Sequence, residues 1–139
     1  MIRILLVDDE RLVRTGLRMI LDGEVDLEVV GEAADGAEAL ALSRSLQPDV
    51  VLMDVRMPRV DGITATARIM ALDPAPAVVV LTTFDLDEHV YAALAAGASG
   101  FLLKDSPEDQ LLAAIRSAGS GVALLAPSVT RRLVAALAP

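Results

Sequence analysis

Residues 1–10, MIRILLVDDE, place a short apolar run directly before a cluster of acids. The run Ile2–Val7 predicts a buried strand, and Asp8, Asp9 and Glu10 follow it without a spacer. Carboxylates at the edge of an apolar core repel one another and lose hydration. The cluster therefore indicates a partner that offsets this repulsion, and a divalent cation is one such partner.

The same kind of apolar run recurs along the chain, separated by stretches with helical spacing. Continuous apolar runs are typical of strands that helices cover on both faces of a parallel sheet. Strands that alternate with helices imply right-handed crossovers in an open sheet. We therefore predict an α/β fold of the flavodoxin-like type: a five-stranded parallel sheet, doubly wound as (βα)5. The expected strands are Ile2–Val7, Leu27–Ala33, Val50–Met53, Val78–Leu81 and Gly100–Leu103.

The helical stretches carry local start and stop signals. Asp35-Gly36 is interpreted as a turn at the start of the second helix. Ser106 is expected to cap the last helix, with Pro107 at its first position. The apolar face of the first helix is predicted to contain Leu12, Leu17, Ile20 and Leu21, and that of the second Ala37, Leu40 and Ala41.

The composition changes near the C-terminus, where Gly119-Ser120-Gly121 follows the last long helical pattern. We expect one domain over residues 1–118, and a linker with a short helix over residues 119–139. Ser128 is a suitable cap for that helix, and its apolar stripe would contain Val129, Leu133 and Leu137.

Composition and charge exclude several classes of function. The 139 residues contain no cysteine, which excludes disulfides and thiolate metal sites and favours a cytoplasmic location. The net charge of −8 argues against direct binding of DNA, because nucleic-acid-binding proteins usually present a basic face. No apolar stretch approaches the ~18 residues that span a bilayer, so no membrane partner is expected.

Polar residues follow four of the five expected strands. The first strand leads to Asp8 and Asp9, the third to Asp54, the fourth to Thr82 and the fifth to Lys104. In an open parallel sheet the functional site lies at the carboxyl ends of the strands. Each residue alone has an ordinary explanation as a turn former, a strand residue or a surface lysine. Their occurrence at successive strand ends favours a common site.

This set of groups suits phosphoryl transfer to a carboxylate. Mg²⁺ prefers a few carboxylates, water and phosphate oxygens, and Asp8 and Asp9 could hold it beside Asp54. Asp54 would be the nucleophile. Lys104 and the Thr82 hydroxyl could then bind the phosphoryl oxygens. Glu10 is interpreted as a helix cap or a solvated loop residue.

Four segments resemble the signature segments of bacterial response-regulator receiver domains, which have the CheY-like fold. These are ILLVDDE (4–10), VVLMDVRMPRVDG (50–62), VVVLTTF (78–84) and GASGFLLKD (97–105). The resemblance covers roughly residues 1–118. It implies that Asp54 is the phospho-acceptor and that Asp8 and Asp9 bind Mg²⁺ together with Asp54 and the backbone carbonyl of Arg56.

The resemblance also implies a conformational switch. Thr82 corresponds to the switch hydroxyl, Lys104 to the phosphate-binding lysine and Phe101 to the aromatic switch residue. Phe101 carries no hydroxyl, although many receivers have tyrosine at this position. Many also have proline after the lysine, with a cis peptide bond. Here Asp105 follows, and we expect a trans bond because a cis bond would cost ~2.5–4 kcal/mol.

The C-terminal third, GASGFLLKDSPEDQLLAAIRSAGSGVALLAPSVTRRLV (97–134), resembles the NarL/FixJ subfamily, in which a LuxR-type helix-turn-helix domain follows the receiver. This resemblance implies a transcription regulator represented by its receiver half, a signalling domain rather than an enzyme. The implied partners are a sensor histidine kinase, a second copy in a homodimer, and DNA only through a separate output domain.

Two other interpretations remain open. A haloacid-dehalogenase-like phosphatase also forms an aspartyl phosphate on an α/β sheet, but it needs an acid two residues after its nucleophile. Here Arg56 stands two residues after Asp54. A phosphorylation-independent receiver-like interaction module is the second alternative. Such modules typically lack one of the site residues, whereas this chain has all of them.

Overall fold

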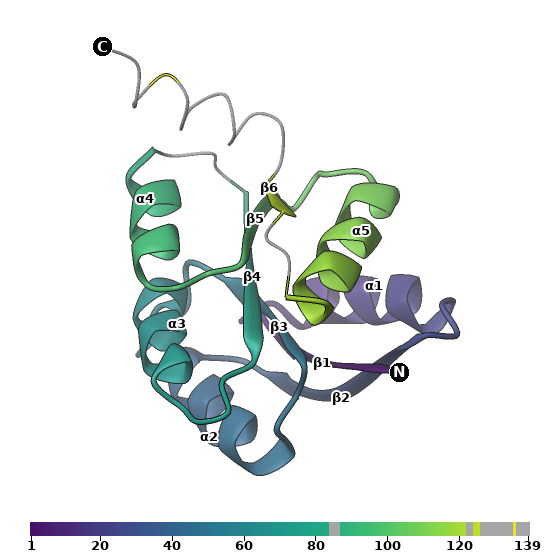
Figure 1. Cartoon of the computed structure of the whole chain (residues 1–139), viewed down its shortest axis with the longest axis horizontal. Helices are drawn as coiled ribbons and strands as arrows, with labels where there is room; N and C mark the ends of the chain where they lie inside the picture. Colours follow the sequence, from purple (N-terminus) through teal and green to yellow (C-terminus); the bar gives the residue numbers. More distant parts are fainter. Residues whose placement is uncertain (84–86, 122–123, 126–134, 136–139) are drawn as a thin grey trace.

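Parallel strands form one sheet at the centre of the protein (Figure 1). The computed structural model describes residues 1–83, 87–121, 124, 125 and 135. The strand order is β2-β1-β3-β4-β5-β6, and every neighbouring pair is parallel. The strands are β1 (Ile2–Val7), β2 (Leu27–Ala33), β3 (Val50–Asp54), β4 (Ala77–Thr82), β5 (Gly100–Leu103) and β6 (Leu124–Leu125).

Helices cover both faces of this sheet. α1 (Arg11–Asp22) and α5 (Glu108–Gly119) lie on one face. The opposite face carries α2 (Gly36–Leu46), α3 (Gly62–Met70) and α4 (Asp87–Ala95), which pack side by side in that order. The predicted doubly wound (βα)5 architecture is therefore confirmed. No helix in the described part of the chain is long and apolar enough to cross a bilayer.

The sheet differs from the prediction in its last strand. Five strands occur where they were expected, with β3 extended to Asp54 and β4 widened to Ala77–Thr82. β6 was not predicted: its two residues pair with Gly100 and Phe101 of β5. The predicted domain end at residue 118 stays a prediction, although part of the segment after it adds to the sheet. The short helix predicted around Ser128 falls outside the described residues.

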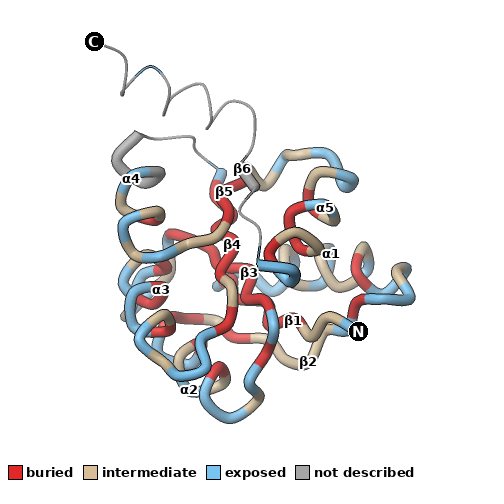
Figure 2. Tube along the Cα trace, viewed as in Figure 1, coloured by how far each residue is buried: buried red, intermediate tan, exposed pale blue. Residues whose placement is uncertain are grey.

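The core runs along the central strands. All five residues of β3 are buried, as are the last four of β1 and the last five of β4 (Figure 2). β2 is at the edge of the sheet and is only partly buried along its middle. Burial of three adjacent strands on both faces explains their continuous Val, Ile and Leu composition. It also gives the residues at their carboxyl ends a rigid support.

Helix faces were predicted less well than strands. Of the residues assigned to the apolar face of α1, Leu21 is buried and Leu17 and Ile20 pack against the core, as predicted. Leu12, assigned to the same face, is 83% exposed. On α2 the exposed residues Ala37 and Ala41 were also assigned inward, whereas Ala39 is buried. Alanine fits either environment, so an alanine-rich helix gives little contrast between its faces.

The start of α2 at Gly36 was predicted correctly, whereas the cap of α5 was predicted wrongly. Asp35 caps α2 by accepting a hydrogen bond from the backbone N–H of Glu38 at 2.9 Å. At α5 the cap position is Pro107, with no side-chain cap hydrogen bond. Ser106 lies one residue too early to cap, because the extended backbone of Pro107 delays the helix to Glu108.

Gly62 at the start of α3 holds the helix close to the end of β3. Its N–H donates to the carbonyl oxygen of Val55 at 2.8 Å. A Cβ atom built on Gly62 would overlap the backbone carbonyl of Asp54. Because the obstacle is backbone, no side-chain rearrangement can relieve the overlap. Only glycine therefore fits at this contact.

We predict that Gly62→Ala destabilises the protein by about 3 kcal/mol, because the overlap forces the backbone of β3 and α3 apart. The matched control is Gly16→Ala at an exposed position of α1, where an added Cβ meets no atom within 4 Å. The control should gain up to about 1 kcal/mol from helix propensity. Urea denaturation of the two variants measures both effects, and equal stabilities would contradict the close approach at Gly62.

Candidate functional site

The predicted polar residues lie at the carboxyl edge of the four adjacent strands β1, β3, β4 and β5. Asp54 is the last residue of β3 and pairs with Leu81, and Thr82 is the last residue of β4 and pairs with Leu103. Lys104 follows β5 directly, and its N–H donates to the carbonyl oxygen of Thr82 at 2.8 Å. The register of the sheet thus aligns these strand ends.

Lys104 joins two buried carboxylates. Its Nζ lies 2.7 Å from Oδ2 of Asp8 and 3.2 Å from Oδ1 of Asp54. Both aspartates are buried, with 2% of Asp8 and 6% of Asp54 exposed. Opposite charges this close and this protected from water attract strongly. The structure therefore brings Asp8, Asp54 and Lys104 together as predicted.

The protonation of Asp54 is strongly affected by this environment. Burial, reinforced by the negative charge of Asp8, raises the pKa of Asp54 from 3.8 to about 6 despite the attraction of Lys104. Burial also opposes the charge of Lys104, but its hydrogen bond to Asp8 and the attraction of Asp54 raise the pKa of the ammonium above its ordinary value. At neutral pH the site thus holds an ionised, poorly solvated aspartate beside a firmly protonated lysine.

A group of acids lies on the β1 side of the site. Carboxylate oxygens of Asp8, Asp9 and Glu10 lie within 4.8 Å of one another. Asp8 is buried, and Asp9 and Glu10 are exposed. Oxygen donors of this kind, partly open to solvent, fit Mg²⁺, which keeps several water ligands. Within the described residues, Asp54 is not part of this group.

Glu10 was counted in this acidic run but was interpreted as a helix cap or a solvated loop residue, not as a metal ligand. It stands at the cap position of α1 but makes no side-chain cap hydrogen bond. Its backbone N–H instead donates to Oδ1 of Asp8 at 2.9 Å. The predicted metal ligands Asp8, Asp9, Asp54 and the Arg56 carbonyl stay a prediction.

The two predicted switch residues are both buried. Thr82 is 3% exposed at the end of β4, and Phe101 is completely enclosed in β5 opposite Val80. Their roles stay predictions. Among the described residues the cis peptide bond is Asp73–Pro74, so the bond between Lys104 and Asp105 is trans as expected.

Comparison with known proteins agrees with this arrangement. The family model described as "Response regulator receiver domain" matches residues 4–116. The chain belongs to the response-regulator receiver family. It is 44% identical over 133 residues to the uncharacterized transcriptional regulatory protein YxjL of Bacillus subtilis, covering 96% of this chain and 61% of YxjL. The chain therefore spans about three-fifths of the length of that relative.

Solved receivers share the fold. A two-component response regulator of the LuxR family from Aurantimonas superposes with a TM-score of 0.92 at 35% identity, covering 97% of this chain and 96% of that one. The signal receiver domain of NarL from Mycobacterium tuberculosis gives 0.83 at 38% identity, covering 86% and 97%. This receiver thus has the CheY-like fold, and its relatives are response regulators of the LuxR/NarL type.

We predict that Asp54→Asn stabilises the receiver in EDTA at pH 7.5 by about 1–3 kcal/mol. Raising the pKa of Asp54 from 3.8 to about 6 is equivalent to roughly 3 kcal/mol. The raised pKa of about 6 means that the folded protein binds the Asp54 proton more tightly than the unfolded chain does. The contribution of Asp54 to the free energy of unfolding is therefore greatest below pH 4. It is lost as the pH rises through 6. The gain in the variant should shrink toward pH 4.5.

Urea denaturation in EDTA between pH 4.5 and 7.5 tests this dependence. Exposed Asp22→Asn is the control and should change the free energy of unfolding by less than about 0.5 kcal/mol. If the difference between wild type and Asp54→Asn stays constant over this pH range, Asp54 does not titrate as stated.

Proposed function

We propose that this receiver accepts a phosphoryl group on Asp54 from a sensor histidine kinase, in a Mg²⁺-dependent reaction, and thereby controls a DNA-binding output domain. The observation that carries the proposal is the ion-paired triangle of Asp8, Asp54 and Lys104 at the carboxyl edge of the sheet. A buried acid at a strand end, held beside one cation, is placed for attack on an electrophile that arrives from solvent.

The chemistry requires an ionised Asp54. With a pKa of about 6, the carboxylate is mostly ionised at neutral pH and is little shielded by water. One of its oxygens attacks the phosphorus of the phosphohistidine, so a P–O bond forms as the P–N bond breaks. The imidazole leaves with the bonding electron pair and takes a proton. Mg²⁺ would supply charge neutralisation between the phosphoryl oxygens and the acids.

The residues around Asp54 have separate roles in this proposal. Asp8 and Asp9 hold the metal ion with Asp54 and the backbone carbonyl of Arg56. Lys104, already 3.2 Å from Asp54, binds a phosphoryl oxygen after the transfer. The Thr82 hydroxyl donates to another oxygen. Thr82 and Phe101 are both buried in adjacent strands. In this proposal, Thr82 moves toward the phosphoryl group and the ring of Phe101 follows.

The partners follow from the family. Two-component response regulators receive their phosphoryl group from histidine kinases, and the relative YxjL is a transcriptional regulatory protein longer than this chain. We propose that DNA is bound by a separate output domain and that the receiver acts in the cytoplasm. A homodimer of the receiver is one arrangement through which phosphorylation would affect the output domain.

Intact-mass analysis after incubation with Mg²⁺ and acetyl phosphate tests the proposal. We expect one added phosphoryl group on wild type, none on Asp54→Asn and none in EDTA. Asp22→Asn, which removes an exposed acid elsewhere, should be phosphorylated like wild type.

Two outcomes would contradict the proposal. Equal phosphorylation of Asp54→Asn would place the acceptor elsewhere. No adduct on folded wild type, together with no binding of beryllofluoride, would favour the phosphorylation-independent interaction module.

A further inference from the structure

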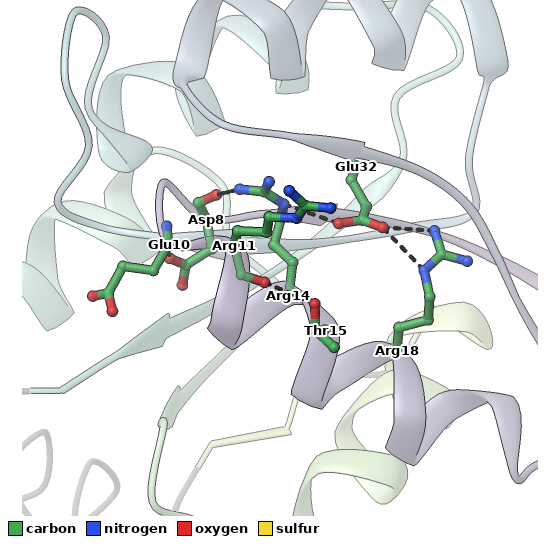
Figure 3. Close-up of polar contacts among 7 residues, drawn as sticks. All are labelled: Asp8, Glu10, Arg11, Arg14, Thr15, Arg18 and Glu32. Carbon is green, nitrogen blue, oxygen red and sulfur yellow. Dashed lines mark hydrogen bonds and ion pairs between the residues drawn. The ribbon is translucent and has the colours of Figure 1, made fainter.

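Arg14 on α1 links the acidic loop after β1 to the edge strand β2 (Figure 3). Its Nη1 donates to the backbone carbonyl oxygen of Asp8 at 2.6 Å, and its Nε donates to Oε1 of Glu32 at 2.9 Å. One guanidinium group therefore contacts both the loop that carries the acids and a carboxylate 18 residues further along the chain.

The carbonyl that Arg14 binds belongs to the peptide group between Asp8 and Asp9. The other backbone group of Asp8, its N–H, donates to the carbonyl oxygen of Ala33 in β2 at 3.1 Å. The Asp8 side chain accepts from the N–H of Glu10 at 2.9 Å. With these contacts in place, the hydrogen bond from Arg14 sets the orientation of the peptide plane from which both acidic side chains project.

Glu32 holds the guanidinium of Arg14 in this position. Its second oxygen, Oε2, accepts from Nε of Arg18 at 3.0 Å, one helical turn further along α1. Arg14 is the better protected of the two arginines, with 15% of its side chain exposed against 39% for Arg18. Hydrogen bonds between charged groups are stronger than those between neutral groups, and the fork of arginine fixes their direction.

We propose that Arg14 is a positioning residue for Mg²⁺ binding: anchored by Glu32, it orients the Asp8–Asp9 peptide so that both carboxylates face the metal ion. This inference rests on the proposed function, in which Asp8 and Asp9 hold Mg²⁺. Arg14 itself binds neither the metal ion nor the phosphoryl group. It acts through the backbone of the loop, as groups outside the direct ligands do in other metal sites.

The electrostatic effect of Arg14 alone has the opposite sign. A cation beside the acidic loop repels Mg²⁺, so removal of its charge by itself would strengthen metal binding. If Arg14 instead acts by positioning the loop, Mg²⁺ should bind more weakly when the hydrogen bond from Arg14 to Asp8 is lost. Arg18 separates the two effects, because it carries the same charge on the same helix and binds the same glutamate.

The experiment is a Mg²⁺ titration of the unphosphorylated full chain, followed by the ¹H–¹⁵N signals of Asp9 and Glu10. We expect Arg14→Met to weaken Mg²⁺ affinity roughly tenfold, as expected when a residue that orients a metal ligand is removed. Arg14→Lys keeps the charge but not the fork, and should weaken the affinity severalfold. Arg18→Met should stay within about twofold of wild type.

Hydrogen exchange of the metal-free protein gives an independent measure of loop order. The amide proton of Glu10 should exchange faster in Arg14→Met than in wild type or in Arg18→Met. The reason is that the hydrogen bond from the Glu10 N–H to Asp8 depends on the position of Asp8. Circular dichroism establishes that each variant is folded.

The outcomes separate this inference from the proposed function. If wild type binds Mg²⁺ and both Arg14→Met and Arg18→Met bind it more tightly, the arginines act by charge and the positioning role is overturned. Wild-type affinity in Arg14→Lys would also overturn it. If wild type binds no Mg²⁺, the proposed function and this inference fail together.

Discussion

The site depends on the ion pairs that the ammonium group of Lys104 forms with Asp8 and Asp54. Parallel strands deliver Asp8 and Asp54 to the same edge of the sheet, where burial removes most of their hydration. Two such carboxylates would repel one another without a shared cation. Lys104 provides it, and its backbone is fixed by the hydrogen bond to Thr82 across the β4–β5 pair. Loss of the lysine would leave two buried charges unpaired, a costlier state than an apolar replacement of all three.

The loop after β3 is held at several points, which stabilises the surroundings of Asp54. The N–H of Gly36 donates to the carbonyl oxygen of Val60 at 3.0 Å, and Arg59 forms an ion pair with the buried carboxylate of Asp35. Gly62 closes the other end of the loop against β3. The segment that contains Arg56 is thereby tied to the neighbouring loop before α2.

Strand positions and strand-end chemistry could be predicted because both depend on local residue type. A run such as Ile4–Val7 is apolar at every position, and in a parallel sheet its end is a defined place. The inward faces of α1 and α2 could not be predicted as well, since Leu12 and Ala37 satisfy the helical pattern but lie away from the sheet. The contact from Arg14 to Glu32 depends on how α1 packs against β2, which spacing along the chain does not express.

Competition for Asp8 connects these features to signalling. The Nζ of Lys104 lies nearer to Oδ2 of Asp8, at 2.7 Å, than to Oδ1 of Asp54, at 3.2 Å. In the proposed function, a metal ion held by Asp8 would compete with this ammonium group for the same carboxylate. Lys104 directly follows β5, the strand that contains Phe101. In the proposed function, the lysine that contacts both carboxylates is therefore attached to the strand that contains the proposed aromatic switch residue.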